Sequence, residues 1–162
     1  MAFTYRDTIP AYALGRRANM EEWNTITRTN ESATAIAFGA PVMVGTGEHT
    51  CIPLDATNGR NVLGITEASQ VLPAIGATTA DSYPRYANVP ICERGVIGVL
   101  LGKTVAKGAQ ARWDTANNEW TDAAQSATVV TIPGAQFDEA GADGSIGIIR
   151  YRRPVLSVSV SG

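Results

Sequence analysis

From residue 33 onward, short apolar runs rich in Val, Ile and Thr are separated by turn residues. This spacing is typical of the strands of a β-sandwich or β-barrel. Gly45-Thr46-Gly47 and Asn117-Asn118 can close hairpins, and Asn58-Gly59 is a turn dipeptide. The pattern predicts strands near residues 34–38, 41–45, 49–54, 61–67, 86–92, 95–101, 110–114, 118–121, 128–132 and 145–151.

We therefore predict an all-β protein: a single jelly-roll-like, sandwich or barrel domain over residues 31–162. Residues 1–30 lack strand-like alternation and mix aromatic with charged residues, which indicates an extended N-terminal arm. Residues 18–23 of this arm can form a short helix with Asn19 as its cap. The arm either contacts a neighbouring subunit or lies as a strap over its own core.

Three further segments carry an expectation about organisation. Residues 67–83 read as a long loop, and such loops usually serve function, so we expect it to reach a partner. Beyond Pro154, apolar residues alternate with Ser, which predicts either an extra edge strand or an arm that adds to a neighbour's sheet. Residues 38–42 echo residues 107–111, and residues 62–65 echo 145–148, which indicates either two related β-units packed into one barrel or chance.

Residues 131–150 form a polar, glycine-studded stretch between two β-type runs, and Pro133-Gly134 near its start reads as a turn. Its Pro-Gly-Ala, Phe-Asp, Ala/Gly-rich stretch and closing apolar strand resemble the C-terminal end of the structural cement proteins of tailed phages. Upstream, residues 28–31 (Arg-Thr-Asn-Glu), followed by Phe38-Gly39 and a strand, resemble a second segment of that family.

The resemblance implies a virion protein that decorates the outer surface of the phage capsid. It implies that the protein cements neighbouring major capsid subunits and stabilises the expanded head against internal DNA pressure. The partners would be the major capsid protein and further copies of the chain, as a homodimer or homotrimer, in particles assembled in the host cytoplasm. The family is structural, so the resemblance implies no enzyme activity and no cofactor.

Composition and charge limit the classes of partner that the protein can bind. The length of 162 residues suits one domain, and the net charge of −2 argues against nucleic-acid binding. The basic pairs Arg16-Arg17 and Arg152-Arg153 read as solvated turns, or as contacts for an acidic protein surface. The sequence has no signal-peptide pattern and no apolar run approaching the ~20 residues of a membrane helix, so we expect no membrane partner.

The sequence contains few side chains that could act in catalysis or bind a metal. His49 is the sole histidine, which excludes sites built from several histidines of one chain, and no Gly-x-Ser-x-Gly elbow occurs. Strand alternation would put His49 and Cys51 on one face, but no third catalytic group accompanies them. Cys51 and Cys92 read as buried small hydrophobes, with a disulfide between them as the alternative. The acidic residues of the loop 138–143 lack a calcium-loop spacing and read as solvated, so we predict no metal site.

The hypotheses about what the protein binds rest on its aromatic residues. Trp113 and Trp120 flank the Asn117-Asn118 turn and are expected to face each other across a hairpin. If their rings were exposed they could stack on sugars, which makes a carbohydrate-binding β-module the alternative function. Tyr and Trp with Arg are the usual anchors of interfaces. The predicted capsid or intersubunit contact residues are therefore Tyr5, Tyr12, Arg16, Arg17 and Trp23.

Overall fold

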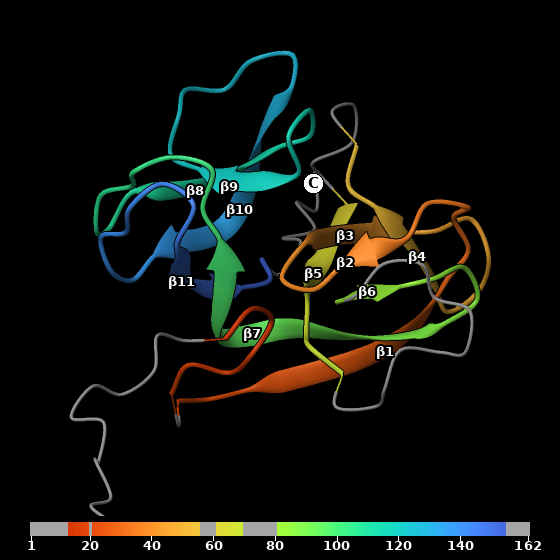
Figure 1. The fold of residues 1–162 in the computed structure, drawn as a ribbon. Coiled ribbons are helices and arrows are strands. Elements are labelled where there is room, and N and C mark those ends of the chain that lie inside the picture. The colour runs from red at the N-terminus through yellow and green to blue at the C-terminus, as the bar shows by residue number, and fades with distance from the viewer. Residues whose placement is uncertain (1–12, 20, 56–60, 70–80, 155–162) are drawn as a thin grey trace, which may run out of the picture.

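A computed structural model gives the fold of residues 13–19, 21–55, 61–69 and 81–154 (Figure 1). Tyr5, Tyr12, the Asn58-Gly59 turn, most of the loop 67–83 and the segment beyond Pro154 lie outside these described residues. The described residues hold strands and no helix, as the all-β prediction required, and so no helix there could cross a membrane. The strands are β1 (Asn24–Asn30), β2 (Ile36–Ala37), β3 (Pro41–Val44), β4 (Thr50–Pro53), β5 (Val62–Thr66), β6 (Ser82–Tyr83), β7 (Asn88–Leu100), β8 (Gln110–Asp114), β9 (Glu119–Thr121), β10 (Val129–Phe137) and β11 (Ile146–Arg152).

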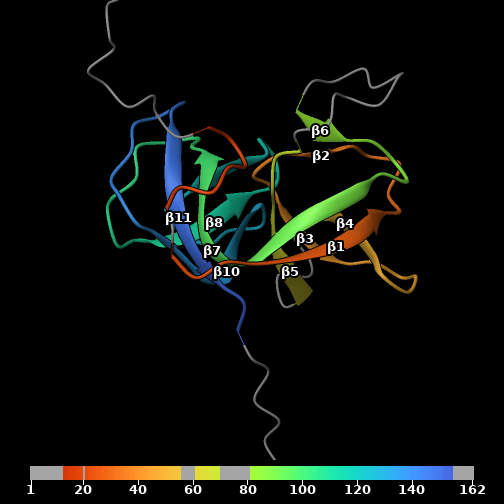
Figure 2. The same cartoon turned by 90° about the horizontal axis from the view of Figure 1, so that it is seen from below.

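The main sheet folds into two barrels that share β7. Its order is β1-β4-β3-β5-β7-β11-β10-β8-β9, and β1 also pairs with β7, which closes the first barrel. The second barrel runs from β7 through β11, β10 and β8 to β9, and a bridge between Leu101 and Trp120 joins its ends. Figures 1 and 2 show β3, β4 and β5 on one side, β8 to β11 on the other, and β7 running through both.

The shared strand β7 is 13 residues long, with a different partner set along each half. Val89 pairs with β1 and Cys92 with β1 and β5, whereas the stretch from Arg94 to Leu100 pairs with β11. The prediction of two strands here was wrong, because Gly95 does not end the strand but continues it in a conformation (φ +151°) that other residues rarely adopt.

The barrels repeat one strand order. In the first, β1 lies parallel to β4, and the antiparallel pairs β4–β3, β3–β5, β5–β7 and β7–β1 complete the circle. In the second, β7 meets β9 through a parallel bridge, and β9–β8, β8–β10, β10–β11 and β11–β7 are antiparallel. The same five steps therefore build both barrels.

Backbone positions with positive φ recur at equivalent places. Gly39 (φ +71°) precedes β3 and Gly108 (φ +78°) precedes β8. Their amides donate to the carbonyls of the last residues of β5 and β10, at 2.9 Å and 2.8 Å. His49 and Asn118, both at φ +58°, directly precede β4 and β9. The repeat thus extends to individual hydrogen bonds.

The sequence echo corresponds to this repeat only in part. Residues 38–42 and 107–111 lead into β3 and β8, which hold equivalent places. Residues 62–65 and 145–148 lie in or beside β5 and β11, which both pair with β7 but hold different places in the strand order. The related units are two barrels rather than parts of one.

The apolar side chains of both barrels form a single buried cluster. Trp113 and Trp120 face each other across the β8–β9 pair, with ring centroids 5.5 Å apart and an interplanar angle of 70°. This confirms the predicted cross-hairpin pair. Trp120 also donates from Nε1 to the Gly39 carbonyl of the first barrel at 2.7 Å, which ties the two barrels together.

The prediction of a turn at Pro133-Gly134 was wrong, because β10 continues through both residues to Phe137. Pro133 has no N–H to donate and Gly134 has φ +80°, so the pairing with β8 shifts register between Thr131 and Gln136. The Gln110 side-chain amide donates to the Ile132 and Ala135 carbonyls at 2.8 Å each, which satisfies backbone groups left free by the irregularity.

Candidate interaction surface

Residues 13–19 and 21–23, here called the strap, lie along β7 and join it to the segment that follows β5. The Gly15 amide donates to the Gly98 carbonyl at 2.8 Å, and the Gly98 amide donates to the Arg16 carbonyl at 2.9 Å. A Cβ on Gly98 would lie 2.5 Å from the Ala13 carbonyl oxygen, so the close approach needs glycine. On the other side, the Ala68 amide donates to the Gly15 carbonyl at 2.7 Å. This part of the expected arm is therefore packed on its own barrels.

The helix predicted for residues 18–23 is not formed. Asn19 accepts a hydrogen bond from the Glu21 amide at 3.1 Å, which is a local turn and no helix cap. Asn24–Asn30 of the expected arm is strand β1. Its polar residues hid it in the sequence, because Ile26 is its only large apolar residue.

Two of the predicted contact residues meet within the strap. The Arg17 guanidinium lies 5.3 Å from the centroid of the Trp23 ring. Arg17 also donates to the carbonyls of Asn19 and Glu21, at 2.7 Å each. The half-buried Trp23 ring covers Gly95, where a Cβ would lie 2.2 Å from the ring. Both side chains therefore shape the strap as well as reaching its surface.

Arg16 differs from its neighbour. Its backbone is tied to β7, while its half-buried side chain makes no hydrogen bond or ion pair with the described residues. Because its side chain is not needed for the strap's hydrogen bonds, Arg16 is the predicted contact residue whose substitution should disturb the fold least. Tyr5 and Tyr12 stay predictions, since they lie outside the described residues.

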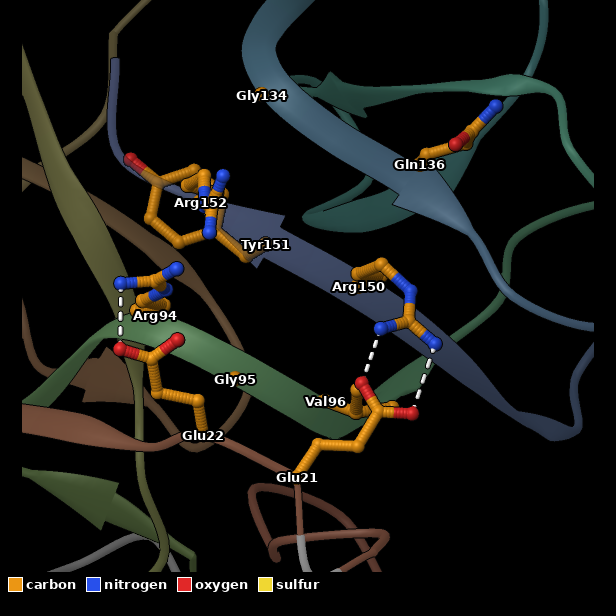
Figure 3. A pocket seen from close by; sticks show the side chains of 10 residues that line it. All are labelled: Glu21, Glu22, Arg94, Gly95, Val96, Gly134, Gln136, Arg150, Tyr151 and Arg152. Carbon is orange, nitrogen blue, oxygen red and sulfur yellow. Dashed lines mark hydrogen bonds and ion pairs between the residues drawn. The ribbon is translucent and has the colours of Figure 1, made fainter. Parts of the chain in front are cut away.

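A shallow charged groove runs beside the strap, where β7 passes β11 (Figure 3). Its larger and smaller parts, of about 850 and 280 Å³, share Glu22, Arg94 and Arg152. Sequence reasoning missed Arg94, because nothing in the sequence shows that the middle of β7 meets the end of β11. It noted Arg152 only as part of a basic pair.

Most arginines of the groove are matched by carboxylates. Arg150 donates to Glu21 and to Asp138, at 3.1 Å from its Nη2 to the Glu21 Oε1 and 3.0 Å to Asp138. Arg94 pairs with Glu22 at 2.6 Å. The hydrogen bond from Arg150 holds the pKa of Glu21 below its usual value, and the two carboxylates raise the pKa of Arg150.

Arg153 pairs with Glu93, but no described carboxylate lies within ion-pair distance of the exposed Arg152. Among the described residues, the groove is therefore a nearly balanced charged surface with one unpaired guanidinium, which suits polar contact with another protein.

The described residues offer little for catalysis. No group of three or more His, Cys, Asp or Glu is placed to hold a metal ion there. Cys51 and Cys92 are free and buried, as predicted, and burial raises their thiol pKa values to about 11 and about 12. His49 is exposed while Cys51 is buried, so the expected shared face was wrong: the left-handed φ of His49 breaks the strand alternation.

The Trp113–Trp120 pair is also closed to ligands. Trp113 is 5% exposed and Trp120 is fully buried. Neither ring face is open for stacking on a sugar, so the premise of the carbohydrate-binding alternative does not hold for this pair.

Comparison with protein families identifies the kind of protein. The family model described as "Structural cement protein (E217 gp24/Pam3 gp6)" matches residues 1–152. The chain belongs to this structural cement family. The resemblance seen in the sequence is thereby confirmed, and the protein is a structural component of the phage virion.

A solved structure supports the fold of this cement protein. A chain from "The capsid of Myoviridae Phage XM1" matches with a TM-score of 0.70 at 13% identity, covering 96% of this chain and 100% of that one. A chain from "The crystal structure of head fiber gp8.5 N base in bacteriophage phi29" matches with a TM-score of 0.47 at 10% identity, covering 84% and 99%. No protein of curated function matches the sequence.

Proposed function

We propose that this cement protein binds the outer surface of the expanded head and joins neighbouring major capsid subunits against internal DNA pressure. The observation that carries the proposal is the family match over residues 1–152. Contacts of modest strength, repeated over the lattice of a shell, resist force together through avidity. A homodimer or homotrimer would supply such repeated contacts from identical surfaces.

The strap and the adjoining groove are the proposed contact surface. Arg16, Arg17 and Trp23 would act there together with Tyr5 and Tyr12, because Arg, Tyr and Trp dominate the binding energy of interfaces. The groove adds the unpaired guanidinium of Arg152. The major capsid protein would meet these groups with polar and acidic residues of its outer face.

Binding to heads tests the proposal directly. Purified protein should sediment with expanded empty heads and not with unexpanded ones, and light scattering should give a defined dimer or trimer mass. Protein that stays in the supernatant with both kinds of head would refute the cementing role.

Variants locate the contact. Deleting residues 1–12 leaves every described strand intact, and Arg16→Ala removes a side chain without described hydrogen bonds. Each should weaken head binding by about tenfold, the effect of losing one important interface anchor. Lys107→Ala, an exposed basic residue of the second barrel, is the matched control and should bind normally. Equal binding by all variants would remove the strap from the interface.

A further inference from the structure

The first barrel carries an exposed aromatic residue in a strained conformation. Tyr86 lies in the turn before β7, is 70% exposed and has φ +66°, in the left-handed region that favours glycine. Its amide donates to the Asn30 carbonyl at 2.7 Å, and the Ala87 amide donates to the Pro84 carbonyl at 3.1 Å. These hydrogen bonds fix the turn and hold the ring outside the barrel.

The second barrel shows what this turn looks like with glycine. Gly144 has φ +71° and precedes β11, the strand equivalent to the first half of β7. Its amide donates to the Leu101 carbonyl at 2.9 Å, as that of Tyr86 does to Asn30. The backbone therefore needs no tyrosine at this position, and the exposed ring of Tyr86 gains little burial in return for the strain. Stability of the fold does not account for the residue.

The neighbouring arginine supports the ring. The Arg85 guanidinium lies 4.7 Å from the centroid of the Tyr86 ring. No described carboxylate lies within ion-pair distance of Arg85, in contrast to Arg94, Arg150 and Arg153. A guanidinium stacked on an aromatic face keeps its N–H edges available for a carboxylate. The pair thus offers an apolar ring face and a cationic edge side by side.

The arginine of this pair lines a groove. Arg85 lines a depression of about 610 Å³ whose apolar part is formed by Ile52, Pro53 and Leu54. The carboxylate of Glu31 on its wall already accepts hydrogen bonds from the Thr46 and Gly47 amides. The groove can take an extended segment that places an apolar side chain on this apolar part and a carboxylate against Arg85, next to the exposed ring of Tyr86.

We propose that Arg85 and Tyr86 form a second contact site, which docks an acidic surface segment of the head's shell protein. The inference rests on the proposed cementing function and adds a partner surface to it. Tyr86 and Arg94 are eight residues apart in sequence, roughly 25 Å along an extended chain. One protomer can then contact the shell at two separate places, which bridging of neighbouring subunits requires.

The substitution Tyr86→Gly distinguishes a contact role from a structural role. Glycine is the residue that the second barrel has in the equivalent turn, at Gly144. The substitution should keep or raise the melting temperature, since glycine adopts φ +66° without strain. It should weaken sedimentation with expanded heads by about tenfold, the effect expected for an interface tyrosine. Arg85→Gln should weaken binding by about threefold to tenfold and flatten its dependence on salt, since it removes the charge alone.

His49→Gly is the matched control: it removes another exposed residue with positive φ from the same barrel and should leave head binding unchanged. A Tyr86→Gly variant that binds heads like the wild type overturns the second contact site and leaves the cementing function standing. So does a variant whose only change is a lower melting temperature. Wild-type protein that does not bind expanded heads removes both proposals together.

Discussion

The two barrels follow the same strand order around one shared strand, yet they treat equivalent turns differently. Before β4 and β9, His49 and Asn118 share the same left-handed φ of +58°. Before β7 and β11, the first barrel has Tyr86 and the second has Gly144. The backbone hydrogen bonds are the same in both turns, so the side chains are free to diverge. The fold therefore requires the backbone conformation and hydrogen bonds of these turns, and it leaves their side chains free to differ.

The hairpins diverge in the same way. In the first barrel Glu31 follows β1 and its carboxylate accepts hydrogen bonds from the Thr46 and Gly47 amides, at 2.6 Å and 3.1 Å. The equivalent residue of the second barrel is Gly102, where a Cβ would lie 2.2 Å from the Glu119 carboxylate. There Asp114 closes the hairpin within its own loop, accepting from the Ala116 amide at 2.9 Å. The first barrel therefore fastens its hairpin to a distant strand, and the second does not.

The largest expected effect comes from Trp120, which fills the second barrel and ties it to the first. Trp120→Ala should lower the free energy of unfolding by about 3–5 kcal/mol, the usual cost of deleting a buried aromatic side chain. Its counterpart Cys51 is also buried but small, so Cys51→Ala should cost about 1 kcal/mol. Urea unfolding followed by circular dichroism measures both values.

The number of unfolding transitions gives a second test of the comparison, because the barrels share β7. Because β7 belongs to both barrels, we expect each variant to unfold in a single transition. Two separate transitions, with only one shifted in Trp120→Ala, would break the comparison, since the barrels would then behave as independent domains.

Intermediate effects are expected at Gly64 in β5 and Gly147 in β11, which both face β7. A Cβ on Gly64 would lie 2.2 Å from the Cys92 carbonyl oxygen, which is backbone and cannot turn away. A Cβ on Gly147 would meet the Leu101 side chain at 2.6 Å, and a side chain can change rotamer. Gly64→Ala should therefore cost about 3 kcal/mol and Gly147→Ala about 1 kcal/mol. Equal losses in thermal unfolding would contradict this distinction.

The smallest effect is a pH dependence at Glu31. Hydrogen bonds from the Thr46 amide and other groups of the turn lower its pKa from 4.5 to about 2. A lowered folded pKa means that the carboxylate stabilises the protein above pH 4.5 and that this contribution is lost as the pH falls from 4.5 towards 2. The difference in melting temperature between wild type and Glu31→Gln should shrink over that range. Glu48→Gln, in the same turn, is the matched control.

Hairpins and buried runs were predictable because local chemistry determines them. The strands at β3, β4, β5, β8 and β9 agree with their predicted ranges to within one or two residues. The predictions that failed depended on contacts between residues that are distant in the sequence. Gly95 was predicted to begin a separate strand, but it lies inside β7, where the Trp23 ring covers it. Pro133-Gly134 was predicted to form a turn, but it lies inside β10, where the Gln110 side chain supplies replacement hydrogen bonds. β1 was missed because tertiary pairing outweighs its weak apolar pattern.

The candidate surfaces were less predictable than the fold. Trp23 and Arg17 were singled out by residue type, but the sequence did not show that they stack on each other. Tyr86 was read as the first residue of a strand, because nothing in the sequence reveals a left-handed φ at a tyrosine. The equivalent turn of the second barrel, with Gly144, shows that the fold itself does not require a tyrosine there.

The continuity of β7 has a mechanical consequence. Its first half is hydrogen-bonded to β1 and its second half to β11, all antiparallel, so no loop links the two barrels along this path. A force applied along β7 loads those inter-strand hydrogen bonds in shear and all at once. A force that peels off a terminal strand would break the hydrogen bonds of that strand one after another. Stretching single molecules from attachment points beyond the two ends of β7 should therefore require higher forces than pulling β9 away from β8.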